Sequence, residues 1–524
     1  MISPETVQKL RECLAHLPHY LGQHVLISVV ALGIGVVVSL PLAVVCSRRA
    51  AWRWPMLTAA SLIQTIPSLA LLALFYPLLL GLSWLSARVL GVSFSALGFL
   101  PTVIALTLYS ILPMLRNTVT GILGVDPAMT EAARGMGMRP LQVLMKVELP
   151  LASPVIVAGI RTATVWVVGI ATLSTPVGQT SLGNYIFTGL QTENWISVLF
   201  GCVSAALLAT VLDQLIGLAE SAAANRSRMR AVAAGLGLAV VIGGGLAPLA
   251  YHPRPDVLIG AKTFEEQFIL ASVIRDQLAE AGMTAGKREG LGSAVAFRAL
   301  TGNEIDCYVD YSGTIWLNQM KREEAADAET VLREMTAWLK REYGIVCLGP
   351  LGFENAYALA MRRERAEALG IRSIADLAAH APEMTIGGDY EFFGRPEWRQ
   401  IQEVYRLRFA ETKQYQSTFM YKAAASGDVD VISAFSSDGR IAAYDLVVLE
   451  DPKGAIPPYD AVVLMSAKAS KDGRLVEAVR PLVGAISVES MRQANYLVDR
   501  DEDKRTVDQA AAWLRKAIGL ATEP

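Results

Sequence analysis

Six long apolar segments dominate the first half of this chain. A membrane-spanning helix needs about 20 predominantly apolar residues, and segments of this kind lie at 24–46, 56–80, 97–115, 151–174, 195–218 and 231–251. Residues 1–254 contain 15 Lys and Arg against 8 Asp and Glu, whereas residues 255–524 contain 32 against 41. The chain therefore joins an apolar, mildly basic half to an acidic half of soluble composition. This division excludes a single globular domain, a disordered chain and a simple membrane anchor.

The basic residues between the apolar segments predict their orientation. They gather after the first, third and fifth segments and comprise Arg48, Arg49, Arg53, Arg116, Arg134, Arg139, Lys146, Arg226, Arg228 and Arg230. Lys and Arg accumulate in cytoplasmic loops, so these connections are predicted to be cytoplasmic and residues after about 252 to be periplasmic or extracellular. Since the basic residues alternate with apolar segments instead of forming one basic face, we expect no nucleic-acid partner.

Arg161 is a charged residue inside the fourth apolar segment. Such an arginine reaches the membrane interface, hydrogen-bonds carbonyl groups inside the helix bundle, or takes part in a transport pathway. The sequence leaves these roles open.

The cytoplasmic connection after the third segment carries the clearest motif. It reads Glu131-Ala132-Ala133-Arg134-Gly135-Met136-Gly137 and continues, nine residues later, with Val147-Glu148-Leu149-Pro150. Pro127 and Pro140 bracket a short predicted helix, in which the small Ala132 and Ala133 allow close packing against a partner. Gly137 would supply a tight turn, and Pro150 would open the next span near its first turn. An amphipathic surface helix without a partner is the alternative interpretation.

This motif resembles the coupling motif of binding-protein-dependent ABC importer permeases. The resemblance extends over most of residues 20–220, and segments 66–70, 158–162 and 182–187 look like the osmoprotectant branch. It implies a MetI-like, type I helical permease in the bacterial inner membrane, paired as a homodimer and surrounded by membrane lipid. It also implies that Glu131, Ala132, Ala133 and Gly137 dock on a cytoplasmic ATP-binding subunit, present in two copies.

The ATPase is expected to be a separate chain. The sequence contains no Gly-x-x-x-x-Gly-Lys-Ser/Thr motif, whose glycine loop would cradle phosphates. The nearest string, Gly260-Ala261-Lys262-Thr263, lacks that loop and lies in the exterior half.

The acidic half has the pattern of an α/β fold. Residues 265–281 repeat apolar residues at helical spacing, and strand-like runs lie at 256–260, 305–308, 357–361, 384–387, 429–433 and 446–449. Strands that alternate with helical stretches predict sheets flanked by helices. Ligands of such folds bind in crevices at strand ends or between lobes, and the loops at these strand ends are rich in aromatic residues beside Gly or Pro.

The order of these loops resembles the binding proteins for glycine betaine, choline and carnitine. The Lys262–Gln267 junction, the Tyr-x-Gly-Thr segment and the Ser-Asp-Gly-Arg segment follow in that family's order. The resemblance implies a two-lobed, type II periplasmic-binding-protein-like domain whose ligand is a small zwitterionic or cationic quaternary amine. It places an aromatic cage around the ammonium, formed by Tyr311, Tyr357, Phe435 and Tyr459. It places Lys262, Thr314 and Arg395 near the ligand's carboxylate. Asn355 would lie at the rim of the cage.

The chemistry of such a ligand agrees with that division. A trimethylammonium donates no hydrogen bonds but is attracted to aromatic faces by roughly 0.5–2 kcal/mol each, whereas a carboxylate binds an Arg fork or a Lys. Two departures leave the ligand open, because Phe435 stands where the family often has tyrosine and Asn355 where it can have an acidic residue. Fusion of permease and binding domain also occurs in relatives that import ergothioneine, so ergothioneine is the alternative ligand.

We therefore expect a permease domain with five spans at 1–225, a sixth spanning tether at 226–254 and an exterior binding domain at 255–524. A sensor would require a cytoplasmic output domain, and the longest predicted cytoplasmic stretch is the coupling connection of about 35 residues. An enzyme would require a nucleophile–base arrangement or a metal cluster, which the spacing does not offer. We expect a transporter subunit without a cofactor or metal site.

The cysteine pattern supports neither a disulfide scaffold nor a zinc site. The five cysteines include no Cys-x-x-Cys pair. Cys307 and Cys347 both lie in the exterior half, where disulfides can form. We expect two unpaired thiols, with a Cys307–Cys347 disulfide as the alternative.

Overall fold

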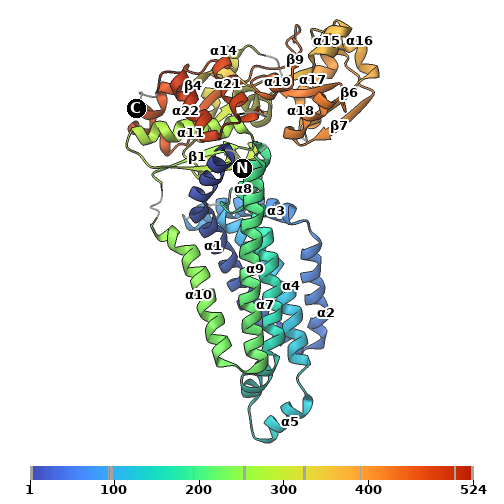
Figure 1. The fold of residues 1–524 in the computed structure, drawn as a ribbon, viewed down its shortest axis with the longest axis vertical. Helices are drawn as coiled ribbons and strands as arrows, with labels where there is room; N and C mark the ends of the chain where they lie inside the picture. Colours follow the sequence, from blue (N-terminus) through green and yellow to red (C-terminus); the bar gives the residue numbers. More distant parts are fainter. Residues whose placement is uncertain are drawn as a thin grey trace. The chain divides into compact units, whose positions relative to one another are not determined.

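A computed structural model describes residues 4–91, 94, 98–192, 194–251, 255–322, 326–389, 391–500 and 503–520. The chain divides into two compact units (Figure 1). The helical unit comprises Leu10–Phe187 and Ile196–Arg254, and the second unit comprises Met1–Lys9, Thr188–Trp195 and Pro255–Pro524.

The first half of the chain is helical. Its principal helices are α1 (Pro4–Arg48), α2 (Ala50–Thr65), α3 (Ser68–Leu90), α4 (Phe99–Leu123), α7 (Leu149–Ala171), α8 (Gly183–Gln191), α9 (Trp195–Asn225) and α10 (Arg228–Tyr251). Among the described residues, six helical segments are long and apolar enough to cross a membrane: Lys9–Arg48, Ser68–Leu90, Phe99–Leu123, Pro140–Val177, Trp195–Asn225 and Arg228–Leu249. The predicted multi-pass membrane half is confirmed.

The prediction of one continuous span at 56–80 is wrong. The structure ends α2 at Thr65 and starts α3 at Ser68, so the second membrane-length helix is α3. Ile66 is extended, with φ −71° and ψ 127°. The ring of a proline disfavours helical geometry at the residue before it. At Ile66–Pro67 this coincides with the break between α2 and α3.

The coupling motif forms a separate short helix, α5 (Pro127–Gly135), as the bracketing prolines predict. The side chain of Asp126 caps it by accepting a hydrogen bond of 2.9 Å from the backbone N–H of Ala128. Gly137 has φ +82°, a left-handed conformation that favours glycine and turns the chain out of the helix. The chain then passes through α6 (Pro140–Val143) and a π-helical turn (Leu144–Glu148) into α7, whose second residue is Pro150.

Within the part of the chain that the structure describes, the partners of Arg161 are carboxylates. Its Nε and Nη2 donate to the two carboxylate oxygens of Asp213 on α9, at 2.6 and 2.7 Å, and its Nη1 donates to Glu220 at 3.3 Å. A bidentate arginine–carboxylate pair of this kind has a defined orientation. Arg161 therefore connects α7 to α9.

The part of the second unit that starts at Pro255, which we call the binding unit, contains two five-stranded sheets. The first has the order β2-β1-β3-β10-β4, with β1 (Val257–Lys262), β2 (Ala285–Leu291), β3 (Cys307–Tyr311), β4 (Val346–Glu354) and β10 (Asp460–Met465). The second has the order β7-β6-β8-β5-β9, with β5 (Tyr357–Arg362), β6 (Thr385–Asp389), β7 (Glu411–Tyr415), β8 (Val431–Phe435) and β9 (Leu446–Val448). We call the regions around these sheets the first and second lobe.

Helices cover both sheets, as predicted for an α/β fold. In the first lobe, α11 (Glu265–Glu280) packs against β1 and β2 and against α21 (Val488–Asp499) and α22 (Val507–Ala517). In the second lobe, α18 (Ser417–Ser426) packs against β6 and β8. The chain passes between lobes where β4 is followed by β5, and again between β9 and β10. The predicted two-lobed fold is confirmed.

The strand prediction located β1, β3, β5, β6, β8 and β9 and missed β2, β4, β7 and β10. Cys307 and Cys347 lie on β3 and β4, which flank β10 in the first sheet. Both thiols are unpaired in the structure, and Cys307 is buried.

Candidate functional site

A cavity of about 230 Å³ lies between the lobes of the binding unit. Its lining comes from the ends of β1, β3, β5, β6 and β8, from the segment before β10, and from α21. All eight residues predicted to bind the ligand line this one cavity: Lys262, Tyr311, Thr314, Asn355, Tyr357, Arg395, Phe435 and Tyr459. Strand-end placement thus brings together residues almost 200 positions apart in the sequence.

The predicted cage rings form a connected aromatic cluster. The ring centroid of Tyr357 lies 4.9 Å from that of Phe435 and 6.3 Å from that of Tyr459. Phe264 connects the fourth ring, Tyr311, to this group, since the centroid of Phe264 lies 6.2 Å from those of both Phe435 and Tyr311. The first lobe supplies Phe264, Tyr311 and Tyr459, and the second supplies Tyr357 and Phe435.

Lys262 lies in the cavity wall with its charge already paired. It is 2% exposed and forms an ion pair with Asp310, which is also buried. Its Nζ lies 5.1 Å from the centroid of the Tyr311 ring. Asp310 therefore neutralises this ammonium in the structure. Thr314, in the short helix after β3, is also buried beside the cavity.

Arg395 is the other predicted carboxylate partner. Its Nη2 donates to Glu391 at 2.6 Å and its Nη1 to Glu397 at 3.4 Å. Its Nε is buried and has no hydrogen-bond partner among the described residues. The guanidinium carbon lies 5.1 Å from the centroid of the Tyr357 ring, next to the aromatic cluster.

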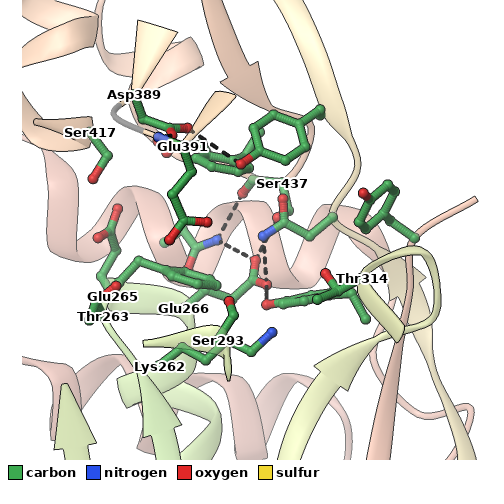
Figure 2. Close-up of a pocket in the computed structure, with 18 of the residues that line it drawn as sticks. Lys262, Thr263, Glu265, Glu266, Ser293, Thr314, Asp389, Glu391, Ser417 and Ser437 are labelled. Carbon is green, nitrogen blue, oxygen red and sulfur yellow. Dashed lines mark hydrogen bonds between the residues drawn. The ribbon is translucent and has the colours of Figure 1, made fainter. Parts of the chain in front are cut away.

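Glu266 is the hydrogen-bond centre of the cavity, as Figure 2 shows. One of its oxygens accepts from Tyr311 (2.5 Å) and Asn355 (3.0 Å), and the other accepts from Ser437 (2.5 Å) and Asn495 (3.0 Å). Ser437 follows β8 of the second lobe, so Glu266 ties the two lobes together. Burial raises the pKa of Glu266, and the hydrogen bond from Ser437 opposes that shift most.

A second carboxyl group faces the cavity from the second lobe. Asp389, at the end of β6, accepts hydrogen bonds from the backbone N–H groups of Glu391 (2.7 Å) and Phe392 (3.0 Å). Burial raises its pKa despite these bonds. It lies in the upper part of Figure 2, beside the labelled Glu391.

Three further carboxyl groups, Glu265, Asp438 and Asp499, are buried with oxygens within 4.8 Å of one another. Three carboxylates this close together could bind a metal cation, but here the guanidinium of Arg440 supplies the positive charge. Its Nη2 lies 2.8 Å from Glu265 and 2.7 Å from Asp438. Glu265 and Asp499 belong to the first lobe and Asp438 and Arg440 to the second, so this ion cluster also connects the lobes.

Acidic groups outnumber basic groups around the cavity. The charged lining residues are Lys262, Arg395 and Arg440 against Glu265, Glu266, Asp389, Glu391 and Asp438. A cavity with this excess and with aromatic faces favours a positively charged ligand group.

The lining residues outside the predicted set include Phe264, Glu265, Glu266, Asp389, Glu391, Ser437, Asp438, Arg440 and Asn495. Phe264 and Glu266 lie at the junction of β1 and α11, where a carboxylate in the first helical turn is favoured, so this signal was present. Asp389 and Glu391 follow a strand that was predicted. Asn495 lies 229 residues from its partner Glu266, and no local pattern identifies it.

Two family models match the chain. Residues 35–224 match the binding-protein-dependent transport system inner membrane component. Residues 255–516, half of the chain, match the substrate-binding domain of the ABC-type glycine betaine transport system. The chain belongs to these ABC transport families, as a permease fused to a glycine betaine-type substrate-binding domain.

Two relatives are similar to this chain over different lengths. The ergothioneine transport permease/ergothioneine binding protein EgtU of Helicobacter pylori is 28% identical over 463 residues, which cover 85% of this chain and 80% of the relative. The choline transport system permease protein OpuBB of Bacillus subtilis is 41% identical over 198 residues, covering 38% of this chain and 84% of the relative. The predicted resemblance to osmoprotectant and ergothioneine importers is confirmed.

A solved structure of a glycine betaine/carnitine/choline ABC transporter also matches. It is 25% identical with a TM-score of 0.46, and the match covers 51% of this chain and 99% of the other.

Proposed function

We propose that this chain is the membrane and receptor subunit of an ATP-driven importer whose substrate carries a quaternary ammonium group. The observation that carries this proposal is the aromatic cluster between the lobes, in a cavity lined by more carboxyl groups than cations. Quaternary ammonium groups are recognised by aromatic faces because they cannot donate hydrogen bonds.

The proposed binding mode gives each end of the ligand its own partner. The ammonium lies against Tyr311, Tyr357, Phe435 and Tyr459, with Asn355 at the rim. A carboxylate, where the ligand has one, is held by Arg395, with Thr314 and Lys262 behind it. The position of the Arg395 guanidinium 5.1 Å from the Tyr357 ring centroid supports this mode, because the two ligand ends lie next to each other in a small betaine.

Glycine betaine, choline and carnitine are the proposed substrates, and ergothioneine is the alternative. The relative EgtU, which carries ergothioneine in its name, aligns with both halves of the chain. Ergothioneine keeps the trimethylammonium and the carboxylate, so the same cage and arginine suit it.

The energy is proposed to come from a separate cytoplasmic ATPase. Two copies of this chain would pair within the lipid bilayer above two ATPases, with permease domain 1–225, tether 226–254 and receptor 255–524 in each. The exposed side chains of Glu131 and Ala132 on α5 are the proposed docking residues, and the turn at Gly137 positions their helix. Ala133 is buried within the chain and supports α5 from behind.

Titration calorimetry on the full chain in lipid nanodiscs tests the ligand class. The panel is glycine betaine, choline, carnitine and ergothioneine, with proline as a zwitterion that lacks a quaternary ammonium. We expect at least one panel member to bind and proline not to bind. Binding of proline alone would contradict the proposal, because it would show that the aromatic cluster serves another purpose.

A further inference from the structure

Arg395 is held by two carboxylates that differ in exposure to solvent. Glu397 is completely buried on α17 (Pro396–Tyr405), and the hydroxyl of Tyr459 donates to it. The side chain of Glu391 is 63% exposed and belongs to the turn between β6 and a short 3-10 helix. Separating Arg395 from Glu397 would leave a buried charge unpaired, whereas the exposed Glu391 can turn into solvent.

The bond between Glu391 and Arg395 is nevertheless the shorter of the two. It measures 2.6 Å between Nη2 and Oε2, against 3.4 Å for the bond to Glu397. Ion pairs with an exposed partner contribute little stability. A second carboxylate that arrives with its own binding energy can therefore replace Glu391 on Nη2.

The place of Glu391 coincides with the proposed place of the ligand's carboxylate. Glu391 lines the cavity and projects into it in Figure 2. Arg395 lies over Tyr357, and Tyr357 contacts the rings of Phe435 and Tyr459. A betaine with its ammonium against these rings has its carboxylate within reach of Arg395, where it meets Glu391.

We propose that Glu391 is a built-in competitor for the ligand's carboxylate and sets the selectivity between zwitterionic and cationic quaternary amines. This inference rests on the proposed function. A zwitterion must displace Glu391 from Arg395 before its own carboxylate binds. A cation without a carboxylate leaves the pair intact and gains from the negative charge nearby.

The variant Glu391→Gln separates the two ligand classes by the sign of its effect. It keeps the shape of the side chain and removes the charge that competes for Arg395. In titration calorimetry with the full chain in nanodiscs, we expect glycine betaine to bind about fivefold more tightly. We expect choline to bind more weakly by a similar factor, about fivefold or less.

Glu411→Gln is the matched control. Glu411 is an exposed carboxylate on β7 that pairs with Lys413 and does not line the cavity. The control makes the same change in charge, and we expect it to leave both affinities unchanged.

A second pair of ligands is needed if the wild type binds ergothioneine but neither choline nor glycine betaine. In that case ergothioneine and its methyl ester are the two ligands to compare, since the ester keeps the ring and loses the negative charge.

Equal shifts for both ligands in Glu391→Gln, or no shift for either, would overturn the competitor role. An equal shift in Glu411→Gln would reduce the effect to general electrostatics and overturn it as well. Failure of the wild type to bind any quaternary amine is a different result, because it contradicts the proposed function before Glu391 is tested.

Discussion

The hydroxyl of Tyr459 donates a hydrogen bond to the carboxylate of Glu397, which has no exposed surface. Tyr459 therefore has two separable parts: a ring that joins the aromatic cluster and a hydroxyl that satisfies a buried charge. Glu397 retains one oxygen without a hydrogen-bond partner among the described residues, so loss of the tyrosine hydroxyl leaves it poorly satisfied.

Tyr459→Phe and Tyr459→Ala test these parts separately. The phenylalanine variant keeps the ring, and we expect ligand affinity to change by less than about threefold, while stability falls by about 1–3 kcal/mol because a buried charged acceptor loses its donor. The alanine variant also loses the ring, and we expect ligand affinity to fall by about tenfold or more. Calorimetry and thermal unfolding of the full chain measure both quantities; equal losses of affinity would contradict a ring contact with the ammonium.

Gly439 is required by the close approach of the lobes. A Cβ at this position would lie 2.3 Å from the backbone nitrogen of Tyr496 and 2.6 Å from the carbonyl carbon of Asn495, both on α21. We expect Gly439→Ala to push the Ser437–Arg440 segment away from α21 and to destabilise the binding unit by about 1–3 kcal/mol. Gly473→Ala is the control, since a Cβ there meets nothing within 4 Å. Equal melting temperatures of the two variants would show that the lobes do not meet at Gly439.

The buried carboxyl cluster predicts a pH dependence of stability. Burial raises the pKa of Glu265 to about 7, with Arg440 opposing the shift and Asp438 adding to it. Asp499 shifts in the same direction, through burial and the charge of Glu265. Between its usual pKa of 4.5 and about 7, Glu265 holds a proton in the folded chain that it has lost in the unfolded chain.

The contribution of Glu265 to stability should therefore fall as pH rises through that window, and the loss should be complete above about pH 7. Glu265→Gln carries no titrating proton, so we expect its stability to decline less steeply between pH 5 and 7. Fluorescence-monitored melting of both proteins at pH 5, 6, 7 and 8 measures the two slopes. A wild-type decline no steeper than that of Glu265→Gln would contradict the assignment.

Glu131→Lys tests the coupling helix. The side chain of Glu131 is exposed on α5, so the change should not disturb folding. We expect ligand affinity in nanodiscs to stay within about twofold, since the receptor is a separate unit, and uptake into ATPase-containing proteoliposomes to fall by at least about tenfold. Normal uptake would remove α5 from the contact with the ATPase.

The sequence predicted most of the site because its aromatic residues stand at strand ends. Tyr311, Tyr357 and Phe435 each begin or end a strand, and such ends converge in α/β folds. Two of the four missed strands, β2 and β4, escaped prediction for physical reasons. β2 has no regular apolar pattern and is half-exposed, and β4 contains Pro350 and two glycines. Single-sequence patterns favour regular, buried strands, and these two are neither.

The charges were harder to predict than the rings. Lys262 and Arg395 were predicted to lie near the ligand's carboxylate, and their pairing with Asp310, Glu391 and Glu397 was not foreseen. Neutralisation of a buried charge depends on three-dimensional proximity, and Asp310 lies 48 residues from Lys262. The break at Pro67, by contrast, had a local signal, because the residue before a proline avoids helical geometry.

The pairing of Tyr357 with Phe435 affects how much conformational entropy is lost when a ligand binds. These residues are direct partners on the antiparallel strands β5 and β8, so backbone hydrogen bonds set the spacing of their rings before any ligand arrives. Ordering side chains on binding costs affinity. Two of the five rings of the aromatic cluster are thus preorganised within one sheet. The entropy lost on binding then falls mainly on the ligand and on the approach of the other lobe.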